Sequence, residues 1–337
     1  MSHDSTSSSA KDRLLRVLGS LSAMRDVEEL IKSKLHSDAS LLSEIPQYLL
    51  ALGGKRMRPA LTLLTARALG VTNAPQALVE VAAGIELIHM ATLLHDDIID
   101  KSPTRRHKES AFLKYGMENT LLSGDFLLVR AFSLCAHLDR CIIDATEQAC
   151  IELTEGEILE VPLHRQEHTL DSSLTIARKK TAALFRLAAF SAAHISGAGE
   201  TCSALFGQFG EKLGIAFQIL DDILDVTSDE TLLGKKAGLD LIERKPSVVN
   251  VLWLQSGETL ALRLRNTPGP DEEAFAAEGI RHLRESSVVA DARRLALRFV
   301  EDSSNALSQA IAKSEKADPK AVADLQALIA YTIARVE

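Results

Sequence analysis

The chain has few aromatic residues and few cysteines, and each shortage argues against a class of protein. Aromatic side chains make up 4% of its 337 residues, whereas a β-sandwich would need more Val, Thr and Tyr than this Ala- and Leu-rich chain supplies. The four cysteines contain no CxxC pair and no zinc-type spacing to histidine, so we expect reduced thiols in a cytoplasmic protein. The composition therefore favours close-packed helices over sheets.

Long uncharged apolar runs and an excess of positive charge are also missing. The most apolar segment, residues 184–199, is interrupted by Arg186 and His194, so we expect no transmembrane segment. The net charge of −8 argues against a nucleic-acid partner but leaves room for a local basic site. Residues 1–10 are polar and serine-rich, so we expect them to be disordered and residues 11–337 to form a single domain.

Helical periodicity is what the sequence has throughout its length. No run alternates with period two for long enough to predict a strand. Glycine and proline pairs, such as Gly53-Gly54 and Ser102-Pro103, break the chain into segments. The expected helices cover residues 11–36, 39–51, 58–70, 75–99, 109–115, 119–138, 141–160, 173–196, 201–226, 246–255, 257–265, 271–283, 288–313 and 318–335. The sequence therefore predicts an all-α helical bundle.

One short acidic pattern occurs twice, each time after an apolar helical run. Both copies read Asp-Asp-x-x-Asp, and their members are Asp96, Asp97 and Asp100 in the first and Asp221, Asp222 and Asp225 in the second. Positions i and i+4 share a helix face, so the outer carboxylates of each copy repel each other unless a cation lies between them. Chance acids at a solvated helix end explain one such cluster well and two poorly. Because Mg²⁺ prefers oxygen ligands and bridges carboxylates to phosphates, we predict a magnesium site.

Basic residues form compact groups that suit a phosphate ligand. The segment from Gly53 to Arg58 is a glycine turn that leads into a helix, an arrangement that binds anions through free N–H groups. Further basic groups are Arg105-Arg106, Lys179-Lys180-Thr181 and the loop from Gly234 to Lys245, with His89 seven residues before Asp96. Each alone has an ordinary reading as a solvated surface group or, for His89, a core histidine. Together with the aspartates they indicate a metal–diphosphate site.

These residues together resemble the trans-isoprenyl diphosphate synthase (polyprenyl synthetase) family. The matching blocks lie in the family's order at residues 54–59, 86–89, 93–106, 124–126, 180–182, 217–225 and 234–245. The resemblance implies the class I isoprenoid synthase fold, a helical bundle around a central cavity, and a homodimer. It also implies the reaction, in which a Mg²⁺-dependent ionisation of an allylic diphosphate is followed by condensation with isopentenyl diphosphate and loss of a proton. Dimethylallyl, geranyl and farnesyl diphosphate are the candidate primers.

The resemblance further implies a role for each matching residue. The residues that would hold isopentenyl diphosphate are Lys55, Arg58, His89 and Arg106. The residues that would contact the phosphates of the allylic substrate, besides the six metal-binding aspartates, are Arg105, Lys180, Lys235 and Lys245. Thr181 and Gln218 would lie beside the forming cation and would act in catalysis together with Lys180 and Arg105.

Three positions depart from the family pattern. His107 and Arg244 stand where the family usually has glycine, and Glu160 stands where it commonly has glutamine. None of the three is a predicted metal ligand. We therefore expect the departures to affect loop geometry near the phosphates.

Two other functions stay open from the sequence. A class I terpene cyclase shares the fold and the first aspartate cluster, but it normally carries an Asn/Ser/Glu motif in place of the second and lacks the Gly-Lys-x-x-Arg segment. A non-catalytic subunit of a heteromeric synthase tends to lose aspartates. Both clusters are intact here, which favours a catalytic synthase. We also expect peripheral membrane contact as a route for product release.

Product length should depend on the side chains one helical turn before Asp96. Ala91 and Thr92 are small and Ile88 is aliphatic, whereas short-chain synthases of the family typically place a bulky aromatic there as a floor. We therefore expect a product longer than farnesyl, of the octaprenyl type, with geranylgeranyl or farnesyl as the alternative. A floor supplied by Phe126 or Phe132 of a neighbouring helix would shorten it.

Replacing Ala91 with Phe or Tyr should block the path of the growing prenyl chain. One helical turn is about as long as one prenyl unit, so a block one turn before Asp96 should shift the product toward about 15–20 carbons. Mass analysis of the dephosphorylated product measures this. An unchanged product length, or a wild-type product no longer than farnesyl, would contradict the open path.

Overall fold

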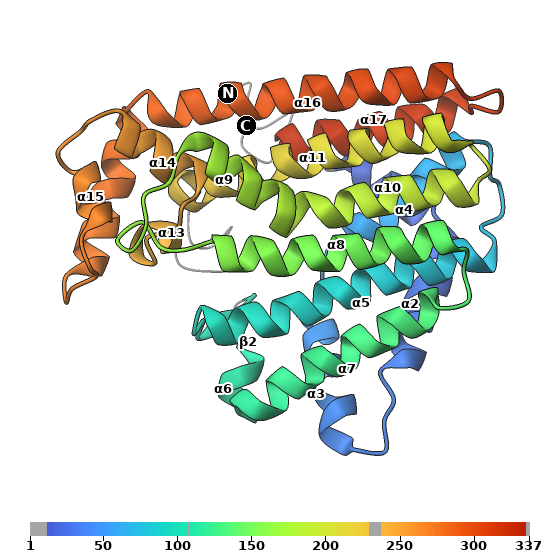
Figure 1. The fold of residues 1–337 in the computed structure, drawn as a ribbon, viewed down its shortest axis with the longest axis horizontal. Helices are drawn as coiled ribbons and strands as arrows, with labels where there is room; N and C mark the ends of the chain where they lie inside the picture. The colour runs from blue at the N-terminus through green and yellow to red at the C-terminus, as the bar shows by residue number, and fades with distance from the viewer. Residues whose placement is uncertain (1–11, 107, 229–236, 335–337) are drawn as a thin grey trace.

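The computed structural model describes residues 12–106, 108–228 and 237–334 (Figure 1). Lys235 and His107 lie outside the described residues, as do the first eleven and last three residues. Residues 12–19 are helical. The named helices are α2 (Ala23–Lys34), α3 (Ser40–Ala51), α4 (Met57–Ala68), α5 (Gln76–Ile99), α6 (Ala111–Tyr115), α7 (Met117–Cys135), α8 (Arg140–Leu159), α9 (Leu170–Ala177), α10 (Ala183–Ile195), α11 (Glu200–Thr227), α13 (Leu239–Ile242), α14 (Val248–Gln255), α15 (Glu272–Glu285), α16 (Val288–Ala312) and α17 (Pro319–Ala334). The predicted all-α class is confirmed.

Helix α5 carries the first aspartate cluster and is buried along most of its length. It packs mainly against α7, and also against α2, α4 and α10, and these contacts bury most of its apolar side chains together with Glu86. By length and composition it is the one helix among the described residues that qualifies to cross a membrane, but 72% of the qualifying window is buried inside the protein. A core helix gives the same result, so this is weak evidence for a membrane span.

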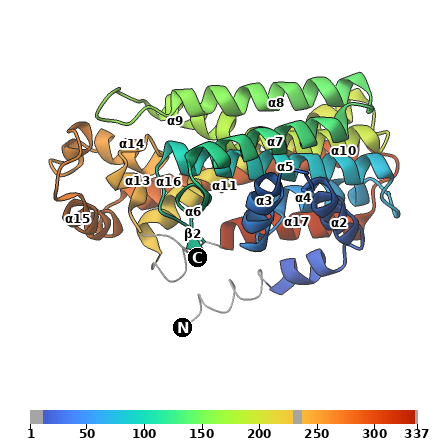
Figure 2. The same ribbon diagram turned by 90° about the horizontal axis from the view of Figure 1, so that it is seen from below.

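Helix α11 carries the second cluster and joins two apolar cores. Phe206 and Phe209 in its first half belong to the larger core. Ile219 and Ile223 in its second half belong to a smaller core that also contains Trp253. Helices α10 and α16 pack along it. In Figure 1 α5 and α11 both end toward the side where α13, α14 and α15 gather, and Figure 2 shows the same grouping from below.

The structure differs from the expected helices in several places. The expected helix 11–36 is interrupted at residues 20–22, and the short helix α13 was not expected. A two-stranded antiparallel ribbon, β1 (Thr104–Arg105) and β2 (Lys108–Glu109), follows α5, although we predicted no strand. Strands of two residues are too short to produce an alternating pattern in the sequence. The expected helix 173–196 contains a π-helical turn, η1 (Arg178–Ala182), between α9 and α10. The expected helix 257–265 is reduced to a 3₁₀ turn, η2 (Ala261–Arg265).

Candidate active site

The C-terminal end of α5 brings the first aspartate cluster into contact with two other segments. Asp97 is fully buried and accepts hydrogen bonds from the guanidinium of Arg105, of which the one from Nε measures 2.9 Å. Asp100 is the C-cap of α5 and accepts from Nζ of Lys245 at 2.9 Å. The β ribbon and the loop before α14 therefore both meet the end of α5.

Asp96 is the member of this cluster whose charge is least favoured. Burial raises its pKa to about 7, while Lys180 and Arg105 oppose the shift and Glu157 and Asp100 reinforce it. Close to neutral pH the carboxyl is thus held partly protonated, so a nearby cation would restore its charge. Such a site favours the binding of a divalent cation.

In the second cluster, two of the three aspartates are tied to neighbouring backbone. Asp222 accepts from Nε2 of Gln218 at 2.8 Å and from the N–H of Val248 at 2.9 Å. Asp225 accepts from the N–H of Asp240 at 3.1 Å. Both carboxylates are buried, whereas Asp221 is half-buried. The pair Asp222 and Asp225 therefore fixes α13 and α14 against α11.

A group of arginines surrounds His89. Burial lowers the pKa of His89 well below its usual value, and the charges of four arginines lower it further, namely Arg58, Arg106, Arg105 and Arg56. His89 is therefore a neutral donor or acceptor inside a strongly positive region. The whole chain has a net charge of −8, yet four guanidinium groups gather near the half-buried His89. This local positive charge favours the binding of a multiply charged anion.

Neighbouring residues of the protein fix the positions of the arginines in this group. Nη1 of Arg56 donates to the buried Glu86 at 2.8 Å. A Cβ added to Gly54 would lie 3.0 Å from Nη1 of Arg56 and 3.1 Å from Nη1 of Arg106, so the absent side chain allows both arginines to approach the turn. Burial lowers the pKa of Arg58, and the charges of Glu86 and Asp221 oppose this. Its Nε is buried without a hydrogen-bond partner in the described residues, so it retains an unused donor.

The remaining predicted lysines lie in different surroundings. Lys55 is exposed, and its Nζ lies 5.2 Å from the ring centre of Tyr331 in α17. Lys180 contacts Glu157 at 2.6 Å and Glu160 at 2.5 Å, and these carboxylates with Asp96 raise its pKa although burial opposes them. The position of Lys180 is thus set by acids of α8 and its C-cap, a partnership that the sequence did not predict.

The π-helical turn η1 places Lys180 and Thr181 between α8 and α11. A Cβ added to Gly156 would lie 2.8 Å from Cγ of Lys180, and one added to Gly214 would lie 2.6 Å from Cα of Ala182. Both glycines therefore allow η1 to press against the flanking helices. Thr181 donates from Oγ1 to Oε1 of Gln218 at 2.6 Å, and Gln218 in turn donates to Asp222. A π turn leaves the regular helical hydrogen-bonding pattern and is frequent at functional sites.

The predicted chain-length residues lie on the buried side of α5. Ile88 and Ala91 belong to the larger core, and Thr92 is half-buried. Of the two aromatic residues considered as a floor, Phe132 is 40% exposed on α7, and the ring of Phe126 faces the guanidinium of Arg130 at 4.8 Å. Ala91 is fully buried, so an aromatic side chain there would overpack the core. An aromatic side chain at the half-buried Thr92 would test the product path with less disturbance of the packing.

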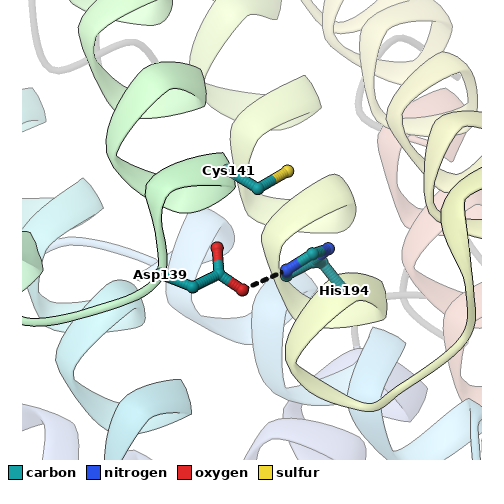
Figure 3. A group of neighbouring side chains, drawn as sticks. All are labelled: Asp139, Cys141 and His194. Carbon is teal, nitrogen blue, oxygen red and sulfur yellow. Dashed lines mark hydrogen bonds and ion pairs between the residues drawn. The ribbon is translucent and has the colours of Figure 1, made fainter.

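A separate group of metal-ligating side chains lies where α8 begins and α10 ends (Figure 3). Asp139, Cys141 and His194 bring their ligand atoms within 4.8 Å of one another, and no other such group occurs among the described residues. Asp139 caps α8 through the N–H of Ile142 at 3.2 Å and accepts from His194 at 2.6 Å, so its contacts have a structural explanation. The predicted aspartates do not converge as closely, so substrate oxygens would have to complete their metal coordination.

Sequence reasoning missed several residues that shape the site. Glu86 holds Arg56, and Glu157 and Glu160 hold Lys180. The sequence contained a signal for Glu160, which departs from the family pattern, and for Glu86, which begins a matching block. It contained none for Glu157, because helix position alone does not show which lysine an acid will meet.

The raised pKa of Asp96 predicts a stability effect in the metal-free protein. Between about pH 4 and 7 the folded chain keeps a proton that an ordinary unfolded carboxyl has lost, so this group lowers stability as pH rises through that window. At pH 8 without divalent cations, Asp96→Asn should raise the free energy of unfolding in urea by about 1 kcal/mol or more, and the gain should vanish near pH 4. Asp139→Asn, at an exposed cap, should give no such gain. A gain that does not change with pH would contradict the raised pKa.

Comparisons with known proteins agree with this geometry. The sequence model of the family described as Polyprenyl synthetase matches residues 39–278. A nonaprenyl diphosphate synthase of Rhodobacter capsulatus is 40% identical over 233 residues, which are 68% of this chain and 71% of that protein. A geranylgeranyl diphosphate synthase of Methanosarcina mazei is 30% identical over 295 residues, 82% of this chain and 89% of that protein.

Solved structures show the same similarity over the whole fold. A polyprenyl synthase of Caulobacter crescentus, complexed with calcium and isoprenyl diphosphate, superposes with a TM-score of 0.86 at 29% identity and covers 97% of this chain and 98% of its own. The family match extends over more than two thirds of the sequence and includes both aspartate clusters. The chain belongs to the polyprenyl synthetase family.

Proposed function

We propose that the chain is a trans-polyprenyl diphosphate synthase, which adds isopentenyl diphosphate head to tail to an allylic diphosphate. The observation that carries this proposal is the presence of two groups of cations near the aspartates. One group consists of Arg56, Arg58 and Arg106 near His89, and the other consists of Lys180, Lys245 and Arg105, whose charge also acts on His89. A condensing enzyme must hold two diphosphates at once, whereas one group would suffice for a cyclase.

The two groups suit two different substrates. Arg58, Arg106 and His89, with Lys55 nearby in sequence, would hold isopentenyl diphosphate. Arg105, Lys180 and Lys245 would contact the allylic diphosphate, because all three already contact carboxylates that a metal–diphosphate would engage or displace. Lys235 would complete this set. Sequence resemblance alone supports Lys55 and Lys235 in these roles.

Mg²⁺ is the proposed cofactor, and it would neutralise the charge that develops on the leaving diphosphate. The half-buried Asp96 and Asp221, with Asp100, would be its direct ligands. Asp97, Asp222 and Asp225, which we also predicted to bind the metal, would act mainly by holding Arg105, Gln218 and the backbone before α14. The bound calcium of the Caulobacter crescentus protein supports a divalent cation in general.

The chain's own residues would stabilise and protect the allylic cation. Oxygens of Thr181 and Gln218 lie 2.6 Å apart beside the π turn and would present negative dipoles to developing positive charge. The apolar walls around Phe185 and Phe217 would exclude water, which otherwise quenches the cation to an alcohol. The released diphosphate would accept the final proton, because the motifs contain no evident general base.

Product length is proposed to exceed fifteen carbons and to be of the octaprenyl type. The small side chains Ala91 and Thr92 support this, and so does the nonaprenyl diphosphate synthase among the relatives. The geranylgeranyl diphosphate synthase among the relatives supports the shorter alternative. The four cysteines of the chain are free thiols, which supports the proposed cytoplasmic location.

Turnover by the purified chain tests the function. With labelled isopentenyl diphosphate, an allylic primer and Mg²⁺, we expect incorporation into linear prenyl diphosphates that chelation abolishes. Asp221→Asn should lower turnover by about two orders of magnitude or more, since it removes a proposed ligand of the metal that neutralises the leaving group. Asp139→Asn, an aspartate of the separate group near α10, is the matched control and should keep full activity.

Three outcomes would contradict the proposal. Cyclic hydrocarbon products would indicate a cyclase, and an inactive chain that recovers with an added partner would indicate a non-catalytic subunit. Normal activity of Asp221→Asn would remove the metal assignment.

The outer face of α7 supports a homodimer. Its exposed apolar side chains recur at helical spacing, with Leu122 56%, Val129 66% and Phe132 40% exposed, and Ile158 of α8 is 75% exposed. Exposed apolar side chains that gather on one helix face often mark a surface that meets another protein. From the family resemblance we propose that this protein is a second copy of the chain.

Val129→Asp should convert the dimer to a monomer at micromolar concentration, because it buries a charge in the seam. Light scattering coupled to size exclusion measures the mass. Leu297→Asp, at an exposed apolar position of α16, should leave the dimer intact. A wild-type monomer with full activity would disprove the homodimer.

A further inference from the structure

Arg244 is a charged residue whose side chain lies inside the protein. It is 1% exposed, and its guanidinium donates to the carbonyl of Leu241 and to that of Asn266 at 3.4 Å. Nη2 lies 2.6 Å from Oε2 of Glu272, and the guanidinium carbon lies 4.6 Å from the ring centre of Phe275. Arginine is almost never fully buried unless it is paired. Through these contacts the guanidinium of Arg244 links its own loop to α13 and α15.

The backbone at Arg244 has a left-handed conformation, with φ of 59°. Residues with a side chain rarely adopt this conformation and keep it only where surrounding contacts hold it. Among the described residues, four that are not glycine have positive φ, and all four are basic: Arg56, Lys101, Arg106 and Arg244. At Arg244 the buried guanidinium supplies such contacts.

The turn sets the position of the next residue, Lys245. The carbonyl of Arg244 accepts from the N–H of Leu163 at 2.8 Å, and the N–H of Lys245 donates to the carbonyl of Asp240 at 2.9 Å. Nζ of Lys245 lies 2.9 Å from Asp100 and 3.1 Å from Glu243. Arg244 and Lys245 follow each other in the chain but have different surroundings. The side chain of Arg244 lies against the smaller core, and that of Lys245 lies at the end of α5.

We propose that Arg244 is a positioning residue for Lys245. Its buried guanidinium locks the left-handed turn, and the turn places the ammonium of Lys245 beside Asp100, where it meets the allylic diphosphate. This inference rests on the proposed function for the role of Lys245, but the anchoring of the turn does not depend on that function.

Kinetics of four variants test the proposal. Arg244→Gln should raise the KM for the allylic diphosphate about tenfold and leave that for isopentenyl diphosphate within about twofold. Lys245→Met should give a similar selective rise. In the double variant the two effects should not add, since Arg244 acts through Lys245.

Arg263→Gln is the matched control. The guanidinium of Arg263 also lies 4.6 Å from the ring centre of Phe275, but its ion pair is with Glu278 at 3.9 Å, and it is about half exposed. Both KM values should stay unchanged in this variant. Equal rises in both KM values for Arg244→Gln, or fully additive effects with Lys245→Met, would overturn the proposal.

Hydrogen exchange supplies a second readout that needs no turnover. Arg244→Gln should lose protection at the amides of Leu163 and Lys245, and Arg263→Gln should not. Unchanged protection would overturn the anchoring role. If Arg244→Gln does not fold, Glu272→Gln keeps the arginine and weakens its anchor, and it should give the same selective changes to a smaller degree. A chain with no synthase activity would refute the proposed function, while the exchange result would still decide the anchor.

Discussion

The concentration of carboxylates in a half-buried region is the constraint on which the rest of the site depends. Burial raises the pKa of Asp96, and the nearby charges of Glu157 and Asp100 raise it further. Lys180 and Lys245 provide the compensating charges in the protein without ligands. A metal–diphosphate would bring both cations and anions, so its binding would exchange these internal ion pairs for stronger ones.

The basic residues are held by means that differ from group to group. Arg56 is fixed by the buried Glu86, and Arg105 is fixed by the buried Asp97. Arg244 is buried outright, and its left-handed backbone directs Lys245 back toward α5. In each case a packed, apolar region of the protein determines where a cation stands. Such preorganisation is what electrostatic stabilisation of a leaving group requires, because no reorganisation is then needed during the reaction.

The helices could be predicted from the sequence because their signal is local. Apolar spacing and glycine or proline breaks located α5 and α11 within one or two residues of their observed ends. The β ribbon escaped prediction because its strands are only two residues long. The π turn at Lys180 escaped prediction because it packs closely against Gly156 and Gly214, which belong to other helices.

The sequence by itself determined the all-α class, the two aspartate clusters and the set of basic residues, because these depend on residue type and short-range spacing. Only the tertiary structure decided which aspartates remain half-buried and which become hydrogen-bond acceptors for distant backbone, as Asp222 does for Val248. It also decided the partners of Lys180 and the burial of Arg244. The physical reason is that burial and ion pairing depend on neighbours far apart in the chain, and packing brings those neighbours together.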